Sequence, residues 1–314
     1  MSPRIVTLTL SPSVDLSTST PVVRPEHKLR CTPGQLDPGG GGLNVSRVVH
    51  ELGGSTLAVF ASGGVTGKLL EQRLVARSIP IQGVPCEAAT RICFNAGESD
   101  TGHEFRFVLP GSPLTTAELR ACVHALEEAL SPGDVLVASG SLPPGLDPAT
   151  YAVIARSANA RGARVVLDTS GAALKAGLEE PLLLAKPSRR ELRELLGLPL
   201  STLEELAAAC RDLHAQRRVE VLVVSMGGEG ALLTSKEGQW FAAPPDVDAR
   251  SAVGAGDSFV AAVTLALSRG ETMDVALSWG TAAGAAALIT PGTQLCLRPD
   301  VERLFPKVRP QRLS

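Results

Sequence analysis

The chain has 314 residues, of which 44% are hydrophobic, 20% are charged and 3% are aromatic. At about 150 residues per domain, this length allows one large domain, or one with a smaller partner, and the apolar fraction excludes a disordered or fibrous protein. The 30 Lys and Arg residues against 32 Asp and Glu residues leave a net charge of −2. We therefore expect no nucleic-acid partner and no attraction to anionic membranes, and any bound anion must meet a local basic cluster.

Cysteine spacing and hydropathy predict where the protein resides. The six cysteines are scattered, and no two have the C-x-x-C spacing of zinc or redox motifs. Scattered thiols are typical of small core residues in a reducing compartment. The sequence contains no run of about 18 apolar residues, so we expect no membrane span. The alternating residues 5–10 indicate a strand rather than a signal peptide. We expect a soluble cytoplasmic protein.

Short β-branched or apolar runs alternate with longer segments of helical period along most of the chain. The predicted strands are residues 4–10, 57–61, 135–138, 163–168, 182–185 and 220–226. The predicted helices are residues 43–52, 67–77, 116–130, 148–161, 188–196, 202–217, 256–269 and 273–288. Strands that alternate with helices predict an α/β fold with a mostly parallel central sheet and helices on both faces.

Two segments break this alternation and predict a small accessory sheet. Residues 91–109 read as two alternating strands around a polar turn, which is a hairpin. Residues 18–36 combine three prolines with polar and β-branched residues. We expect a small antiparallel β lid, formed by about 16–36 and 88–110 and attached to the α/β domain. The basic segment 307–314 is expected to be a solvated chain end.

A glycine-rich segment directly before a predicted helix is the strongest local indication of chemistry. It contains Gly254, Ala255, Gly256 and Asp257. Backbone N–H groups that converge at a helix N-terminus form a site for a phosphate or a developing phosphoryl charge. A carboxylate beside such a site suits a general base that acts on an attacking hydroxyl. The structural alternative is a helix start capped by Asp257.

Further polar residues could complete a ligand site. Four glycines, Gly39 to Gly42, run directly into a helix that carries Asn44, and they permit a close backbone approach to a polar ligand. Asp15 follows the first predicted strand, so we expect it at the carboxyl end of that strand, where open α/β sheets bind ligands. A turn residue is the alternative for Asp15.

Basic residues in the two irregular segments are candidates to hold an anion. They are Lys28, Arg30, Arg91 and Arg106. If the lid folds over the sheet end, these side chains would surround an anionic group, and Arg presents two parallel donors to a phosphate. Solvated strand charges are the alternative.

Two later segments have both a structural and a nucleotide-binding interpretation. Residues 186–191 read Lys-Pro-Ser-Arg-Arg-Glu, in which Ser188 and Glu191 fit a capping box, whereas Glu191 also suits a carboxylate near phosphate-bound Mg²⁺. The glycine-containing residues 225–230 either admit a nucleotide or make a hairpin. The spacings of a Walker loop, a Rossmann fingerprint and an H-E-x-x-H zinc site are all absent from the sequence.

Taken together, these segments resemble the ribokinase-like (PfkB) family of carbohydrate kinases over essentially the whole chain. The segments that carry the resemblance are 39–44, 139–145, 186–191 and 254–257. Residues 7–15, 28–32, 38–44, 105–111 and 292–296 also resemble a branch of that family, the minor bacterial 6-phosphofructokinases.

The resemblance implies a single ribokinase-like kinase domain that phosphorylates fructose 6-phosphate at O1 with ATP, as in glycolysis. It implies Asp257 as the base and the backbone of Gly254, Ala255 and Gly256 as the anion hole. The implied sugar-phosphate residues are Asp15, Lys28, Arg30, Gly40, Gly41, Asn44, Arg91, Arg106 and Ser139. The implied ATP-binding residues are Lys186, Ser188, Ser225, Gly227, Gly228 and Gly230. Glu191 is implied on the Mg²⁺ side. The implied K⁺ residues are Ser251, Val253, Ala287, Thr290, Gly292 and Gln294. A homodimer joined lid to lid is also expected, because the lid is too small to bury both faces of its sheet.

The sequence departs from the family pattern at Ser188, where the family has Asn. It also departs from the branch at Thr290 and Gln294, where the branch has Asn and Arg. Related activities stay open at this point, namely phosphorylation of tagatose 6-phosphate or of fructose 1-phosphate. A non-catalytic sugar-phosphate-binding regulator is the alternative of a different class, although the intact Asp257 and Glu191 argue against it.

Overall fold

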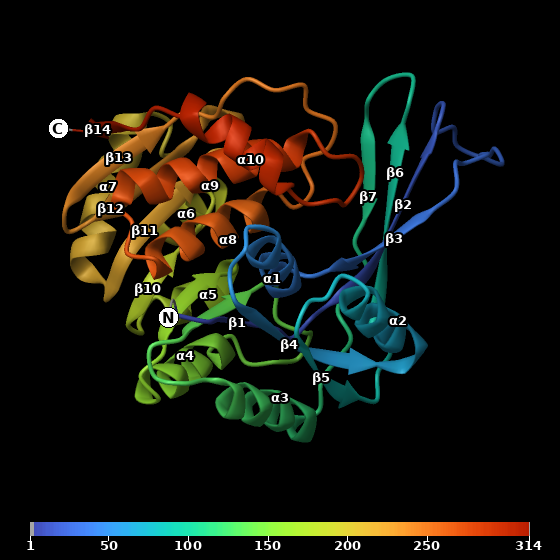
Figure 1. Ribbon diagram of the computed structural model, residues 1–314, viewed down its shortest axis with the longest axis horizontal. Coiled ribbons are helices and arrows are strands. Elements are labelled where there is room, and N and C mark those ends of the chain that lie inside the picture. The colour runs from blue at the N-terminus through green and yellow to red at the C-terminus, as the bar shows by residue number, and fades with distance from the viewer. Residues whose placement is uncertain (1–2, 314) are drawn as a thin grey trace.

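In the computed structural model, which describes residues 3–313, the chain forms a large sheet and a small one (Figure 1). The large sheet contains β1 (Ile5–Thr9), β4 (Thr56–Gly63), β5 (Ile81–Cys86), β8 (Val135–Ser139), β9 (Arg164–Asp168), β10 (Leu182–Ala185), β11 (Val219–Ser225), β12 (Ala231–Ser235), β13 (Gly238–Ala242) and β14 (Gln311–Leu313). Their order is β14-β13-β12-β11-β10-β9-β8-β1-β4-β5.

The strands from β11 to β5 are all parallel, and β12, β13 and β14 continue the sheet in antiparallel pairs. The predicted mostly parallel sheet is therefore confirmed. β14 adds to the sequence prediction: within the expected solvated end at 307–314, Gln311 and Arg312 are indeed exposed, but Gln311–Leu313 also pair with β13 at the sheet edge. Ser314 lies outside the described residues.

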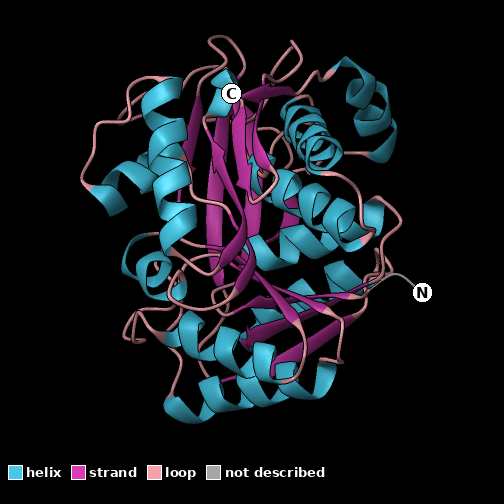
Figure 2. Cartoon of the chain, turned by 90° about the vertical axis from the view of Figure 1, so that its left-hand side faces the viewer, coloured by secondary structure: helices cyan, strands magenta, loops and turns pink. Residues whose placement is uncertain are grey.

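Helices cover both faces of this sheet, as Figure 2 shows. They are α1 (Gly41–Glu51), α2 (Gly64–Val75), α3 (Thr116–Ala129), α4 (Thr150–Ala160), α5 (Gly171–Gly177), α6 (Arg189–Leu196), α7 (Leu203–Gln216), α8 (Ala255–Ser268), α9 (Met273–Leu288) and α10 (Arg298–Leu304). Alternate side chains of β8 enter different cores: Val135 and Val137 pack toward α8 and α9, whereas Leu136 packs toward α3 and α4. Both faces are thus buried, which a parallel sheet requires.

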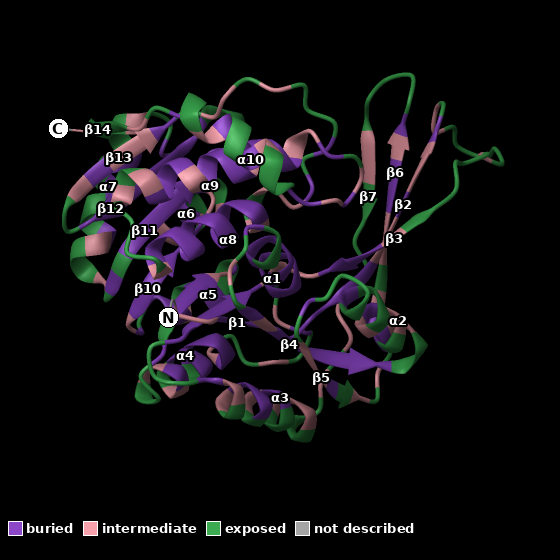
Figure 3. Cartoon of the chain, viewed as in Figure 1, coloured by how far each residue is buried: buried purple, intermediate pink, exposed green. Residues whose placement is uncertain are grey.

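Helices α8 and α9 are among the most buried elements (Figure 3). A Cβ atom on Gly280 would lie 2.4 Å from Cγ2 of Val263, so the absence of a side chain on α9 allows the two helices to approach closely. This contact explains the Ala and Gly content of the two segments. Among residues 3–313, no helix is both long and apolar enough to cross a membrane.

The small sheet forms the lid and contains β2 (Ser13–Thr20), β3 (Gln35–Gly39), β6 (Arg91–Glu98) and β7 (Glu104–Phe107) in the order β3-β2-β6-β7. The β3–β2 and β6–β7 pairs are antiparallel, and the central β2–β6 pair is parallel. The first lid segment begins at Ser13 and ends at Gly39, beyond the expected 16–36. Figure 1 shows these strands standing beside the large sheet.

Candidate active site

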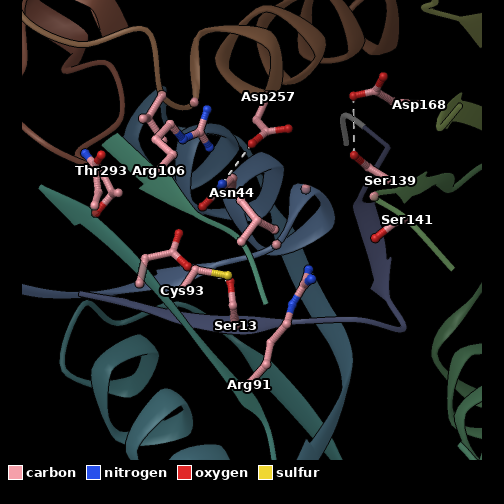
Figure 4. Close-up of a pocket in the computed structure, with 18 of the residues that line it drawn as sticks. Ser13, Asn44, Arg91, Cys93, Arg106, Ser139, Ser141, Asp168, Asp257 and Thr293 are labelled. Carbon is pink, nitrogen blue, oxygen red and sulfur yellow. Dashed lines mark hydrogen bonds between the residues drawn. The ribbon is translucent and has the colours of Figure 1, made fainter. Parts of the chain in front are cut away.

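A cleft of about 330 Å³ lies between the lid and the carboxyl ends of the large sheet. Figure 4 shows side chains from both parts facing this cleft. The residues singled out from the sequence that line it are Asp15, Gly40, Gly41, Asn44, Arg91, Arg106, Ser139, Glu191, Val253, Gly254 and Asp257. The fold therefore brings together residues separated by more than 200 positions in the chain.

Asp257 enters the cleft from the first turn of α8. The helix begins after Gly254, whose φ of 75° is left-handed and favours glycine. An added Cβ there would also lie 2.3 Å from Cδ2 of Leu295. The first N–H groups of an α-helix have no partner within it, so those of Ala255 and Gly256 are available to an anion, and the helix dipole adds positive potential.

The surroundings of Asp257 favour its action as a base near neutral pH. The pKa of Asp257 is raised to about 6, first by desolvation and then by the charge of Asp168, whereas the hydrogen bond from Asn44 and the charge of Lys186 oppose the shift. Nδ2 of Asn44 donates a hydrogen bond of 2.8 Å to Oδ2 of Asp257 (Figure 4). At pH 7 the carboxylate is mostly ionised, and its pKa is high enough for it to accept a proton readily.

The glycine cluster places a second helix N-terminus at the same cleft. Gly40 precedes α1 with a φ of 112°. An added Cβ on Gly41 would lie 2.2 Å from Oγ of Ser139 and 3.0 Å from the backbone nitrogen of Gly140. Only glycine therefore lets the start of α1 approach the end of β8 this closely.

The lid contributes Asp15, Arg91 and Arg106. Asp15 does not lie at the carboxyl end of β1, as the sequence suggested; it lies inside lid strand β2, because the chain turns after β1 and pairs with β6. Arg91 donates hydrogen bonds to the carbonyl oxygens of Leu109 and Ser11, at 2.7 and 3.1 Å. Within residues 3–313, Arg106 forms no hydrogen bond or ion pair, and its guanidinium group is available at the cleft.

Lys28 and Arg30 are not brought to the cleft in this chain. Both belong to the segment 21–34 between β2 and β3, in which most residues are exposed. Neither side chain lines the cleft beside Arg106. Their assignment to the sugar phosphate stays a prediction without support from the geometry of the single chain.

The expected nucleotide side begins where β9 and β10 end. Nζ of Lys186 lies 3.1 Å from Oδ1 of Asp168. Burial alone would lower the pKa of Lys186, but the charge and hydrogen bond of Asp168, together with the charges of Glu191 and Asp257, outweigh it, and the net pKa is raised. Lys186 is therefore a fixed positive charge whose field acts on the carboxylate of Asp257.

Ser188 and Glu191 form the capping box that the sequence offered as the structural interpretation. The Ser188 backbone N–H donates to Oε2 of Glu191 at 2.7 Å, and the Glu191 N–H donates to Oγ of Ser188 at 3.3 Å. Glu191 nevertheless lines the cleft. Beside it, the Ser225 N–H donates to the carbonyl oxygen of Pro187 at 3.2 Å, which places the loop 225–230 next to the start of α6. This loop does not line the cleft itself; Gly227 and Gly228 begin a short 3₁₀ helix that ends before Gly230.

The residues expected around a monovalent cation bring neutral oxygen atoms together at the end of α9. The Thr290 hydroxyl lies 2.8 Å from the carbonyl oxygen of Ala287 and 3.0 Å from that of Gln294. Nearby, the Val253 N–H donates to Oγ of Ser251 at 3.2 Å. Gly292 follows in the same turn, with a φ of 62°.

Sequence reasoning missed several polar residues that line the cleft. They are Ser13, Asn95, Ser141, Asp168, Thr169 and Thr293. Asp168 had a usable signal, because it is the last residue of a predicted parallel strand and ligands bind beyond such ends. Asn95 had none, since its position depends on how the lid folds. Ser13, Ser141 and Thr293 lie within segments that carry the family resemblance, but no role was assigned to them.

Comparison with known proteins identifies the family. Residues 9–300 match the family described as pfkB family carbohydrate kinase. The chain belongs to the pfkB family of carbohydrate kinases. A relative from Mycobacterium tuberculosis, named ATP-dependent 6-phosphofructokinase isozyme 2, is 46% identical over 303 residues, which is 96% of this chain and 89% of the relative.

Solved structures agree with this assignment. Phosphofructokinase-2 from Escherichia coli in complex with potassium matches with a TM-score of 0.93 and 37% identity, covering 98% of this chain and 99% of that one. The same enzyme in complex with fructose 6-phosphate matches with a TM-score of 0.92 and 36% identity over the same shares.

A relative with a different name also matches by sequence. A 1-phosphofructokinase from Bacillus subtilis is 31% identical over 309 residues, 98% of this chain and 100% of the relative.

Proposed function

We propose that this pfkB-family kinase transfers the γ-phosphoryl group of ATP to O1 of fructose 6-phosphate, giving fructose 1,6-bisphosphate and ADP. A cleft with the carboxylate of Asp257 on one side and the guanidinium groups of Arg91 and Arg106 on the lid side carries this proposal. Such a cleft suits a substrate that has a reactive hydroxyl at one end and a phosphate at the other. The name of the 46% identical relative supports it.

In the proposed reaction, Asp257 accepts the proton of the O1 hydroxyl as that oxygen attacks the γ-phosphorus. The new O–P bond forms while the bond between the γ-phosphorus and its bridging oxygen breaks, and ADP leaves with that oxygen. The backbone N–H groups at the start of α8, at Ala255 and Gly256, stabilise the charge on the transferring group. Lys186 supplies a positive charge on the nucleotide side.

Magnesium fits the donor groups present. Among residues 3–313, no three His, Cys, Asp or Glu side chains come together as a metal site. Mg²⁺ in phosphoryl-transfer enzymes needs only one or two carboxylates, because phosphates and waters complete its octahedron. Glu191, whose carboxylate lines the cleft, would hold it on the nucleotide side. When bound, the metal neutralises charge on the β- and γ-phosphates.

Potassium is supported by the chemistry of the residues at the end of α9. The carbonyl oxygens of Ala287 and Gln294 converge on the Thr290 hydroxyl, and neutral oxygens of this kind replace the hydration shell of a monovalent cation. The potassium complex of the E. coli enzyme supports the same assignment. Thr290 retains a side-chain oxygen, so its departure from the branch pattern is compatible with the site.

We also infer a homodimer joined through the lid, a cytoplasmic location and a role in glycolysis, in which fructose 6-phosphate is phosphorylated. Ile92, Val108 and Leu109, on or directly after the lid strands, are 42%, 61% and 52% exposed. A four-stranded sheet with apolar side chains at its surface is stabilised when another sheet or copy covers it.

Two alternatives remain to be separated from this proposal. The identity to a 1-phosphofructokinase supports fructose 1-phosphate as a second candidate substrate. Both activities need a base, an anion hole and a phosphate site, so the cleft supports either one. A non-catalytic regulator would not need Asp257 beside the start of α8.

A coupled assay of ADP release tests the proposal across fructose 6-phosphate, fructose 1-phosphate, tagatose 6-phosphate and free fructose. We expect the highest kcat/KM with fructose 6-phosphate and a product phosphorylated at positions 1 and 6. A higher kcat/KM with fructose 1-phosphate would replace the substrate assignment. Binding of fructose 6-phosphate without turnover of any sugar would support the regulator.

A further inference from the structure

The side-chain amide of Asn44 is held between a donor and an acceptor. Nη1 of Arg47 donates to Oδ1 of Asn44 at 3.0 Å, and Nδ2 of Asn44 donates to Oδ2 of Asp257 at 2.8 Å. A guanidinium group can only donate, and an ionised carboxylate can only accept. The two neighbours therefore fix which end of the amide faces the carboxylate.

Arg47 is itself held in place from several directions. Its side chain is 9% exposed, and Nη1 also donates to the carbonyl oxygen of Pro38 at 2.6 Å. Nη2 lies 3.8 Å from Oδ1 of Asp37, whose side chain is fully buried. Burial lowers the pKa of Arg47 to about 10, with Asp37 opposing the shift. Arg47 is therefore charged at neutral pH and remains a donor.

Asp37 connects this arrangement to three other parts of the fold. It lies in lid strand β3, and its Oδ1 accepts a hydrogen bond of 2.6 Å from Nη2 of Arg77, which follows α2. Its Oδ2 accepts bonds from Gln35 at 3.0 Å and from Thr293 at 3.2 Å. The lid, α1, α2 and the loop after α9 thus meet at one carboxylate.

We propose that Arg47 is a positioning residue for phosphoryl transfer: it fixes the Asn44 amide so that Asp257 keeps one oxygen hydrogen-bonded and presents the other to the sugar hydroxyl. The inference rests on the proposed role of Asp257 as the base. Arg47 does not line the cleft; its contact with Asp257 runs through Asn44, and its charge acts on Asp257 in addition. Asp37 holds Arg47 and makes the orientation depend on the position of the lid strand.

Loss of Arg47 should raise the pKa of Asp257, which a mere loss of side-chain packing around Arg47 would not do. Without its donor, the amide of Asn44 can turn its oxygen toward Asp257, and an acceptor at that place favours the protonated carboxyl. Loss of the positive charge acts in the same direction. The other charged groups that act on Asp257 are Asp168 at the end of β9, Lys186 after β10 and Asp15 on β2, and these stay unchanged.

Three variants test the proposal, namely Arg47→Met, Arg47→Lys and Arg77→Met. We expect Arg47→Met to lower kcat by about 10- to 100-fold, because a misplacement of about 1 Å at a catalytic group has an effect of that size. The acidic limb of its kcat profile should move to higher pH, with a smaller change in the KM for fructose 6-phosphate. Arg47→Lys should recover part of kcat, since an ammonium group can still donate to Oδ1 of Asn44.

Arg77→Met is the matched control. It removes the other guanidinium group that binds Asp37 and leaves the contact between Arg47 and Asn44 in place. We expect it to lower the melting temperature and to keep the acidic limb of the wild type. If Arg47→Met and Arg77→Met lose stability alike, with kcat and the acidic limb unchanged in both, Arg47 is only structural and the proposal fails.

Two outcomes separate this inference from the proposed function. If Arg47→Met does not fold, the test uses Arg47→Lys and Asn44→Ala instead. The proposal is overturned if Arg47→Lys keeps the kcat and the acidic limb of the wild type and Asn44→Ala keeps wild-type activity.

If Asp257→Asn retains wild-type activity, the assigned base is wrong. An inactive Asp257→Asn with an unperturbed Arg47→Met leaves the base in place and rejects only the positioning role.

Discussion

Nζ of Lys186 lies 3.1 Å from Oδ1 of Asp168, where β9 and β10 end next to each other. This ion pair places one negative and one positive charge within the electrostatic reach of Asp257. Asp168 raises the pKa of Asp257 and Lys186 lowers it, while desolvation makes the largest contribution and brings the pKa to about 6. The pair therefore adjusts the pH at which Asp257, the proposed base, becomes ionised.

Changes to the two partners should move the pH profile in opposite directions. The wild-type kcat should fall with a midpoint near pH 6 as Asp257 is protonated. Asp168→Asn removes a negative charge, so the pKa of Asp257 falls and the acidic limb moves to lower pH. Lys186→Met removes a positive charge, so the limb moves to higher pH. These directions are checked by measuring kcat for both variants from pH 5 to 8, about the range in which a group of this pKa titrates. Movement of the acidic limb in the same direction in both variants would contradict the prediction.

Arg106 and Arg91 should differ in their effect on the sugar phosphate. Arg106 has no partner among residues 3–313, whereas Arg91 already binds two carbonyl oxygens. Arg106→Ala should raise the KM for fructose 6-phosphate by about 10- to 150-fold, which corresponds to a charge-assisted hydrogen bond of about 1.5–3 kcal/mol. The KM for ATP should hardly change.

Arg91→Ala should also lower the melting temperature, because it removes a link between the lid and the loops at Ser11 and Leu109. Steady-state kinetics with both substrates and a thermal melt distinguish the two arginines. Equal use of free fructose and fructose 6-phosphate by the wild type would remove the phosphate role from both.

Substitutions of Ser188 distinguish its role as the cap of α6 from its expected effect on the Mg²⁺ requirement. Ser188→Ala should lower the free energy of unfolding by about 1 kcal/mol, because it removes the cap of α6. Thr202→Ala removes the equivalent cap of α7, away from the cleft, and should have a similar effect on stability. Ser188→Asn keeps a capping oxygen and adds an amide that reaches further.

We therefore expect Ser188→Asn to lower, several-fold, the Mg²⁺ concentration needed for half-maximal activity. Glu191→Gln should do more harm, since it removes a negative charge. Chemical denaturation and Mg²⁺ titrations of activity check these variants, with Thr202→Ala as the control. If Ser188→Asn leaves the Mg²⁺ titration unchanged, Ser188 is a helix cap alone.

Ile92 offers a direct test of the lid-to-lid dimer. It lies on β6 and is 42% exposed, whereas its neighbours Arg91 and Cys93 face the cleft. Ile92→Asp should dissociate the dimer, because it would bury a charge in an apolar interface. Val153→Asp places the same charge on α4, at a residue that is 56% exposed, and should leave the dimer intact. Sedimentation velocity at micromolar concentration measures this; a fully active wild-type monomer would contradict it.

The parallel sheet, its helices and the family were accessible from the sequence because their signals are local. Val135 and Leu136 alternate into two cores, and the glycines before α8 mark its start. The first lid segment was expected from the sequence, but its two strands and their pairing were not. β2 pairs with β6, more than 70 residues later, and the prolines between β2 and β3 conceal the strand pattern.

The same limit applies within the site. Asp257 was visible through its glycine segment, but the partners that tune it come from other strands and helices. Asn44 is more than 200 residues away in the chain, and the contact of Lys186 with Asp168 depends on the neighbouring ends of β9 and β10. Lys28 and Arg30 show the opposite case, since favourable residue types alone did not place them at the cleft.

The most direct test of the account is the turnover of Asp257→Asn together with its affinity for fructose 6-phosphate. The substitution keeps the size of the side chain and removes its ability to accept the proton of the sugar hydroxyl. We predict that kcat falls by about 10²- to 10⁴-fold, the range for loss of a general base. The Kd for fructose 6-phosphate, measured by calorimetry, should stay close to that of the wild type, because the proposed phosphate site lies on the lid and not at Asp257. Turnover within a few-fold of the wild type would contradict the account.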